Sequence, residues 1–279
     1  MLTSLFNLTL KNAAATRSLT LSLDDYVYEE SDGFAMPPVQ RFVEHSPLAH
    51  GAVDCGFRLL PRRLTFRLML RATSPTAFYD LRRDLIDILR PAYNNAAGTL
   101  AATLPDATTW ELSVFCEKLD FTSPKGLLQE AVFTLSAPQP VWRQVSSPTT
   151  TYLYQSDIGR TKIIPYPGSW LAVPYPFTIR GPISHPVITN QTAEMKIDLD
   201  TVIPDNEIVS IDLRQGYKTI LLGSQSLLGC LSSDSDLDAF CLLPDPDAAS
   251  GNNVFQLTGS ASGSNTRLAL GFTIMRLGL

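Results

Sequence analysis

The sequence has 279 residues, of which 44% are hydrophobic and 18% charged, and its formal net charge is −5 at pH 7. This length exceeds what one hydrophobic core usually fills, so it predicts two domains. The acidic balance argues against binding to nucleic acid or an anionic membrane through overall charge, and the low share of charged residues favours a chain that buries surface in subunit contacts.

Targeting and redox signals are weak. Residues 1–10 contain no basic region followed by an unbroken apolar stretch, so we predict no signal peptide. Polar residues or prolines interrupt every apolar run, which predicts no transmembrane helix and a protein made in the cytoplasm. The four cysteines form no C-x-x-C pair, so we expect reduced, mostly buried thiols at Cys55, Cys116, Cys230 and Cys241.

The chain opens with leucines that alternate with polar residues. The pattern predicts two half-buried strands, with inward leucines at Leu5, Leu8, Leu10, Leu19, Leu21 and Leu23. From Ser31 to Gly51 the sequence is rich in Gly, Pro and His and has no period, which predicts a long loop.

The clearest strand is Arg63 to Arg71. Apolar residues at positions 64, 66, 68 and 70 fall on one face, and Arg63, Arg67 and Arg71 fall on the other. One face is therefore expected in the core, and the opposite face is basic.

A helix follows this strand, and it is the only convincing one in the sequence. Ser74 is a suitable N-cap and Pro75 a suitable first-turn residue, and apolar residues then recur at helical spacing until Pro91. Arg83 and Asp87, four residues apart, predict an ion pair on its exposed side.

Further strands are predicted on both sides of a proline-rich boundary. Two prolines within residues 137–140 cannot donate to a strand ladder, so we divide the chain near residue 138 into domains 1–138 and 139–279. The second half contains many short strands and no helix, which indicates an antiparallel sandwich or jelly roll. The predicted strands are 99–104, 110–116 and 127–135 in the first half, and 177–180, 195–199, 208–213, 219–222, 253–258 and 267–275 in the second.

Motifs for catalysis are absent from the sequence. It contains no G-x-S-x-G, H-E-x-x-H or G-x-x-x-x-G-K-[ST] pattern, and its only histidines are His45, His50 and His185. We therefore predict no catalytic residues, no cofactor and no enzymatic activity. His45 and His50 lie near Asp54 and Cys55, but their spacing matches no standard zinc site, which favours exposed loop histidines.

An acidic stretch resembles part of a calcium loop. Asp234, Asp236 and Asp238 occupy alternate positions, as the first three ligands of such a loop do, but the sixth position is Ala239 instead of glycine. A solvated acidic loop before a strand at 239–243 is favoured over an ion site.

Two other features have alternative interpretations. Trp170 could stack on a sugar ring, although a subunit contact or core position is favoured. Arg58 and Arg62 extend the basic stripe of Arg63, Arg67 and Arg71. The three arginines of the strand are spaced roughly 13 Å apart, which is sparse for a nucleic-acid groove, so pairing with carboxylates of a neighbouring subunit is favoured.

Five segments in a particular order resemble one known family. They are Gly56–Arg71 with the helix that carries Leu81-Arg82-Arg83 and Leu89-Arg90-Pro91, then Pro140-Val141-Trp142, Pro176–Asn190, Ile208–Arg214 and the closing Arg267–Leu279. Together they are similar to the distal tail proteins of siphophage baseplates. Two departures from the family pattern are a longer loop at 243–252 and no recognisable inserted arm or carbohydrate-binding module.

The resemblance implies a mainly β fold, with an N-terminal split β-barrel that carries one helix and a C-terminal galectin-like sandwich. It also implies a homohexameric ring in the virion tail tip, between the tail tube protein and a tail hub or tail-associated protein. DNA would pass through the ring without sequence-specific contacts, and no membrane would be bound. We expect Arg63, Arg67, Arg71, Arg82 and Arg83 to contribute to the subunit interface, and Trp170 to form a surface contact. The alternative is a monomeric glycan-binding sandwich protein.

Overall fold

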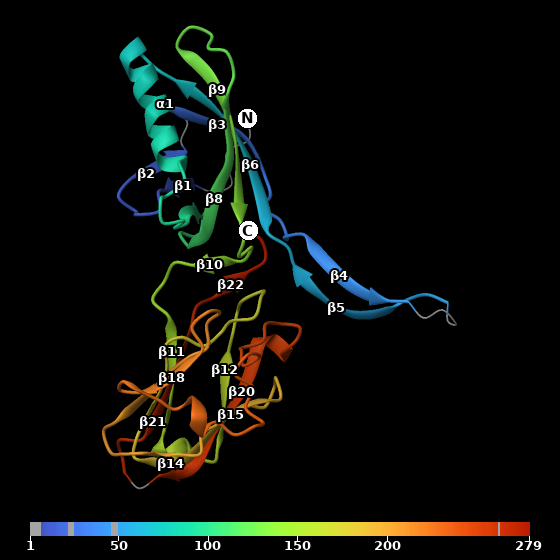
Figure 1. The fold of residues 1–279 in the computed structure, drawn as a ribbon, viewed down its shortest axis with the longest axis vertical. Coiled ribbons are helices and arrows are strands. Elements are labelled where there is room, and N and C mark those ends of the chain that lie inside the picture. Colours follow the sequence, from blue (N-terminus) through green and yellow to red (C-terminus); the bar gives the residue numbers. More distant parts are fainter. Residues whose placement is uncertain (1–6, 22–24, 46–49, 262) are drawn as a thin grey trace. The chain divides into compact units, whose positions relative to one another are not determined.

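The computed structural model describes residues 7–21, 25–45, 50–261 and 263–279 (Figure 1). Leu5 and Leu23, which were predicted to be inward strand positions, lie outside the described residues. The chain divides into a first unit, Met1–Val145 with Leu277–Leu279, and a second unit, Ser146–Arg276. The sequence prediction placed this division near residue 138.

The main part of the first unit is one antiparallel sheet that curls into a nearly closed barrel. Its strands follow the spatial order β2-β1-β7-β8-β9-β6-β3, and a short strand, β10, pairs with β8. The bounds are β1 Asn7–Lys11, β2 Ser18–Leu21, β3 Tyr26–Asp32, β6 Arg62–Arg71, β7 Gly98–Thr103, β8 Thr109–Phe121, β9 Leu128–Ala137 and β10 Trp142–Gln144.

Strand β6 confirms the predicted alternation. Leu64, Phe66, Leu68 and Leu70 are fully buried, and the residues between them point outward. Phe66 stacks on Phe133 of β9 with ring centroids 5.0 Å apart. Each of these apolar side chains contributes about 1.5–3 kcal/mol by leaving water, so this strand anchors the barrel core.

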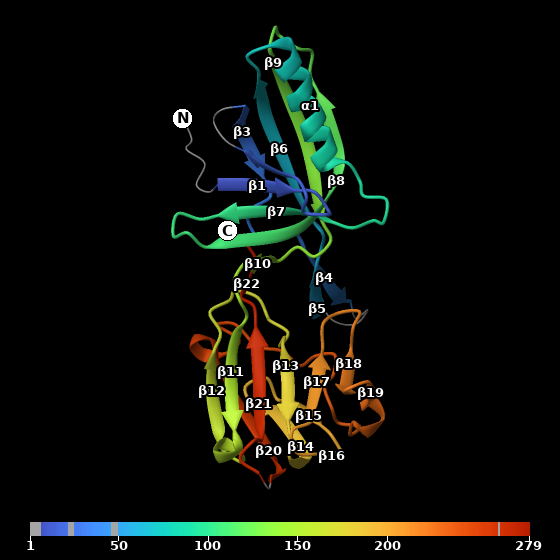
Figure 2. The ribbon, with the colours of Figure 1, turned by 90° about the vertical axis from the view of Figure 1, so that its left-hand side faces the viewer.

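The predicted helix is α1 (Pro75–Leu89), the one α-helix among the described residues. The Ser74 side chain accepts a hydrogen bond from Ala77 N at 3.2 Å, and Pro75 occupies the first turn. The helix ends before Pro91, as expected, and it packs against β6 and β8 through its buried face (Figure 2).

The predicted long loop at 31–51 is wrong in part. The region contains the end of β3 at Asp32 and all of β4 (Val39–Glu44), which pairs with β5 (Val53–Leu59) just after it to form a two-stranded antiparallel ribbon. We call β4 and β5 the arm. The arm pairs with no other sheet in the described part of the chain. The expectation that the chain lacks an inserted arm is corrected by the same observation.

The second unit is a sandwich of two antiparallel sheets. One follows the order β11-β21-β13-β17-β18-β19, and the other follows β12-β20-β14-β15 with β16 beside β14 (Figure 2). The bounds are β11 Thr149–Tyr154, β12 Thr161–Pro165, β13 Phe177–Arg180, β14 Ile183–Asn190, β15 Met195–Asp198, β16 Val202–Ile203, β17 Ile208–Asp212, β18 Thr219–Leu222, β19 Gln225–Ser226, β20 Asn252–Ala261 and β21 Arg267–Phe272, with short 3-10 turns at Gln155–Asp157, Leu228–Cys230 and Ala249–Gly251. A last short strand, β22 (Met275–Arg276), belongs to neither of these two sheets. The mainly β prediction is confirmed.

One predicted strand of the second unit, at 239–243, is absent. Leu242 forms only an isolated bridge with Ala172, while Phe240 packs in the core against Phe177, with ring centroids 5.7 Å apart. Asn253 replaces a strand partner here, because its side chain donates to Leu243 O at 2.9 Å and accepts from Leu243 N at 2.8 Å. A buried asparagine therefore satisfies backbone groups that would otherwise be unpaired.

Candidate subunit interface

The arm exposes apolar side chains on both of its faces. Directly opposed residues of two strands share a face, so Arg41 and Phe57 lie on one side, and Phe42 lies opposite Gly56 on the other. Phe42 is 44% exposed and Phe57 51% exposed. A two-stranded ribbon without a covered face is only marginally stable in water, so the arm needs a partner surface.

Each phenylalanine of the arm lies beneath an arginine from the opposite strand. The guanidinium of Arg58 is 5.6 Å from the ring centroid of Phe42, and that of Arg41 is 6.0 Å from the ring centroid of Phe57. Arg41 also forms an ion pair with Asp54. Aromatic and arginine side chains are enriched in the buried centres of protein interfaces, so both faces of the arm have the composition of a contact surface.

The segment that leads into the arm is fixed to the barrel by a glycine. Gly33 has φ = +98°, and a Cβ at this position would lie 2.1 Å from Arg63 O, so no other residue fits without backbone movement. At the other side of the root, Leu60 N donates to Pro38 O at 2.8 Å. We call residues 33–38 the arm root.

Arg62 does not belong to the basic stripe, contrary to the sequence interpretation. It is only 1% exposed, on the core side of β6 with Leu64. Its side chain donates to Pro140 O at 3.0 Å and to Gly33 O at 2.6 Å, and also to the carbonyls of Ala35 and Leu277. Burial lowers the pKa of Arg62 to about 10.

Arg58, also assigned to the stripe from the sequence, lies on β5 of the arm, and the other three stripe arginines lie on the outward face of β6. Arg63 Nε lies 3.3 Å from Glu117 of β8, and Arg67 Nε lies 3.0 Å from Glu130 of β9, whereas Arg71 is exposed at the end of the strand. Carboxylates of β8 and β9 thus hold Arg63 and Arg67 in place on this surface. Their role at a subunit interface stays a prediction.

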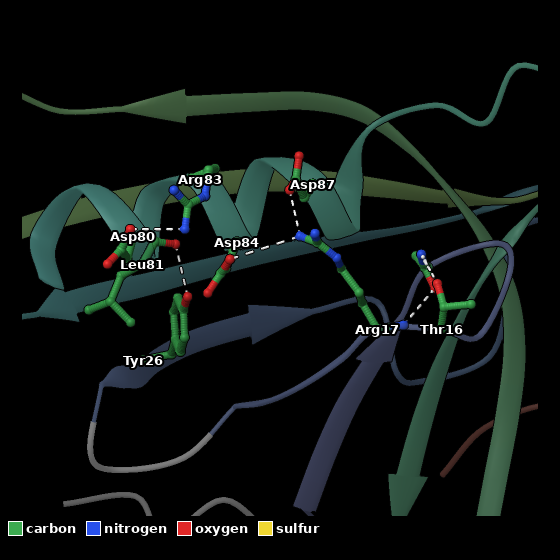
Figure 3. A network of polar contacts seen from close by, with 9 residues as sticks. Thr16, Arg17, Tyr26, Asp80, Leu81, Arg83, Asp84 and Asp87 are labelled. Carbon is green, nitrogen blue, oxygen red and sulfur yellow. Dashed lines mark hydrogen bonds and ion pairs between the residues drawn. The ribbon is translucent and has the colours of Figure 1, made fainter.

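The two helix arginines are held separately from the stripe. The guanidinium of Arg82 lies 4.6 Å from the ring centroid of Phe121, on β8, while Arg83 pairs with Asp80 at 2.9 Å. The predicted pair between Arg83 and Asp87 is wrong. Asp87 instead accepts a hydrogen bond from Arg17, in the segment that leads into β2 (Figure 3).

The side chain of Trp170 is half-buried, and its backbone carbonyl accepts a hydrogen bond from the Tyr166 hydroxyl at 2.6 Å. Burial is the main cause that raises the pKa of Tyr166 above its ordinary value. The loop around Trp170 is thus tied to the sandwich, and the predicted surface contact stays a prediction.

The three aspartates of the acidic stretch contact two lysines. Asp234 pairs with Lys196 at 2.9 Å, Asp236 accepts from the Lys196 backbone N–H at 3.0 Å, and Asp238 pairs with Lys218 at 3.1 Å. In the described part of the chain, no group of three or more His, Cys, Asp or Glu side chains could hold a metal ion. His45 and His50 are both exposed.

The cysteines differ from the expectation of mostly buried thiols. All four are free, Cys55 on the arm is exposed, Cys116 and Cys230 are partly exposed, and Cys241 alone is buried. Burial raises the pKa of Cys241 to about 11. Over the described residues, no helix has the length and apolar character that crossing a bilayer requires.

The second unit contains an exposed cluster of one arginine and two tyrosines that the sequence did not predict. The guanidinium of Arg214 lies 3.7 Å from the ring centroid of Tyr175 and 4.8 Å from that of Tyr217. Asp212 fixes it through a 2.7 Å contact and, by its hydrogen bonds with Arg214, has a lowered pKa. Only the fold brings these residues together.

Comparison with known proteins finds similarity in structure alone. No protein-family model matches the sequence, and no curated protein matches it. Two structures of the phage p2 baseplate in its activated conformation, with Sr and with Ca, align over 97% and 96% of this chain and 97% of theirs. Their identity is 10% and their TM-scores are 0.45 and 0.41, values too low to support an argument.

A third structure is much more similar. The crystal structure of the SPP1 Dit (gp 19.1) protein, described as a paradigm of the hub adsorption apparatus in phages that infect Gram-positive bacteria, aligns with a TM-score of 0.66. The alignment covers 97% of this chain and 98% of that chain, at 13% sequence identity. The predicted resemblance is confirmed at the level of the fold, and the chain has the fold of a phage distal tail protein of the SPP1 Dit type.

Proposed function

We propose that this chain is a structural protein of a phage tail tip. Six first units would form a ring that joins the tail tube protein to a tail hub or tail-associated protein and leaves a channel for DNA. The observation that carries the proposal is the alignment with SPP1 Dit over nearly the full length of both chains. The role is geometric, so the proposal includes no substrate turnover, no cofactor and no sequence-specific DNA contact.

The arm supports self-association. Its apolar side chains remain exposed in the isolated chain, although a ribbon of this kind is stable only when a face is covered. If the arm of each copy packs on a different surface of the next copy, the contact is heterologous, and such contacts close into rings when the rotation between copies allows it.

The outward arginines supply further contacts in this proposal. Glu117 and Glu130 hold Arg63 and Arg67 on the outward face of β6, where guanidinium groups can also reach carboxylates of a neighbouring subunit. Arg71, Arg82 and Arg83 extend this proposed set along β6 and α1.

The test is the size and symmetry of the purified chain. Six copies of the 30.6 kDa chain give a closed ring of about 184 kDa, measurable by light scattering during size-exclusion chromatography and visible by negative-stain microscopy. Replacing both arm phenylalanines with serine, F42S and F57S, is expected to give folded monomers. The matched control is V202S, which changes an exposed apolar residue of the second unit and should leave the ring intact.

The contradicting result is a chain that stays single at every concentration and occurs in virions as single copies without rotational partners. A monomer that binds sugar, and loses that binding in Trp170→Ala, would favour the alternative of a glycan-binding protein.

A further inference from the structure

The arm root is held by a group whose parts come from distant places in the sequence. Arg62 donates to the carbonyls of Gly33 and Ala35 in the arm root, to Pro140 after β9, and to Leu277 near the end of the chain. All of these residues belong to the first unit, although Leu277 follows the whole of the second unit in sequence.

The chemistry of this group depends on arginine. The guanidinium is buried, its hydrogen bonds described here all go to backbone carbonyls, and its planar fork sends donors in several directions at once. An apolar side chain of similar length would fill the space but leave these carbonyls without a donor, and a buried acceptor without a partner is unfavourable. Arg62 therefore joins the arm root to two other segments, at Pro140 and Leu277, with which the arm root forms no strand ladder among the described residues.

Residues Leu277–Leu279 contact the arm root a second time. Leu279 N donates to Phe34 O at 3.2 Å, and a Cβ on Gly278 would lie 3.2 Å from the same oxygen, so the tail runs closely along Phe34. Phe34 in turn stacks on Trp142 with ring centroids 5.7 Å apart and meets Phe66 edge-on at 6.0 Å. The tail thus covers a residue that connects the arm root to the barrel core.

We propose that Arg62 and Leu277–Leu279 form a latch, which means that their contacts hold the arm root in place against the barrel. The arm of a chain is then fixed only after residues 277–279, which follow the second unit in the sequence, have bound to the first unit. The link to assembly rests on the proposed function, because that function gives the arm its role. The latch itself is a property of one chain. In an assembling tail it would bias the ring toward subunits with both units folded.

Hydrogen exchange of the full chain, followed by mass spectrometry, tests the latch. Deleting residues 277–279 removes no strand of either unit, and R62M removes the central donor while keeping an apolar stem. Both variants are expected to accelerate exchange at the Leu60 amide and along β4 and β5 by about tenfold or more, whereas β9 and β14 stay as protected as in the parent chain. The matched control is R143M, at an exposed arginine of β10, and it should leave the arm root unchanged.

The deletion variant decides the outcome if R62M fails to fold. An arm root that keeps its protection without residues 277–279 overturns the latch, and so does faster exchange that spreads equally through β9 and β14, because it would report general destabilisation. If the parent chain never forms rings but the deletion still releases the arm root, the proposed function fails and the latch stands.

Discussion

Arg17 Nη1 lies 2.5 Å from Asp87 Oδ2, which ties the segment leading into β2 to the last turn of α1 (Figure 3). The two residues are 70 positions apart in the sequence. To the left of this pair in Figure 3, the Tyr26 hydroxyl of β3 donates to Leu81 O at 2.8 Å, so the helix is attached to this side of the barrel at two points.

Arg17→Ala and Asp87→Asn should each lower the free energy of unfolding by about 0.5 kcal/mol, because both side chains are partly exposed and water screens the pair. A double-mutant cycle in urea should give a coupling energy of about the same size. Arg83→Ala is the control, since Arg83 pairs with Asp80. A coupling between Arg83 and Asp87 as large as that between Arg17 and Asp87 would contradict this assignment.

Ser74→Ala should destabilise the first unit by about 1 kcal/mol, because the Ser74 hydroxyl accepts the hydrogen bond from Ala77 N at the start of α1. Ser74→Asp keeps an acceptor at the cap and should retain most of the stability. Urea unfolding followed by circular dichroism measures both variants. Equal stability of the alanine and aspartate variants would show that the cap contributes little.

The Asp212 carboxylate should stabilise the second unit in a pH-dependent way. Its pKa is lowered in the folded chain, first by the hydrogen bonds from Arg214, so its contribution is present above its ordinary value of 3.8 and is lost as pH falls through the folded-state pKa. Asp212→Asn should therefore cost about 1 kcal/mol at pH 7.

The measurement is the unfolding free energy of both chains between pH 7 and pH 3. The difference between parent and variant should shrink below about pH 4. Asp247→Asn, at an exposed position of the second unit, serves as the control and should show no such change. A difference that grows on acidification would have the wrong sign for this assignment.

Cys55 should be the most reactive thiol of the monomer, since it is exposed on the arm, whereas burial raises the pKa of Cys241 to about 11 and keeps that thiol protonated. Labelling with a coloured thiol reagent at pH 7.5 should show a fast phase that disappears in Cys55→Ser. In rings of the proposed kind this phase should slow, because the arm would be covered. Equal labelling rates in monomers and rings would place Cys55 outside the interface.

Much of the fold could be predicted because each element carries its own local pattern. Strand β6 alternates strictly and buries one face, and α1 has a cap, a first-turn proline and a helical apolar period. Predicted strands of the second unit, such as 177–180 and 219–222, match the observed bounds. In these elements the burial partner lies within the same chain.

The arm could not be predicted from an alternation of apolar and polar residues. Both of its faces are exposed, so neither face has to be apolar along its whole length. The burial of Arg62 could have been predicted from the sequence. Arg62 shares its parity with Leu64, so the period of two places it on the buried face, yet the neighbouring arginines made it look like part of a basic surface. The pair between Arg17 and Asp87 has no local signal at all.

Folding and the proposed assembly place different demands on the sequence of the arm. Because neither β4 nor β5 is covered by the rest of the chain, replacing residues between Val39 and Leu59 with a short turn should leave the barrel folded. The resulting protein should be a monomer in solution. Substitutions along this ribbon should accordingly leave thermal melts of the isolated chain unchanged, and under the proposed function the same changes should block ring assembly.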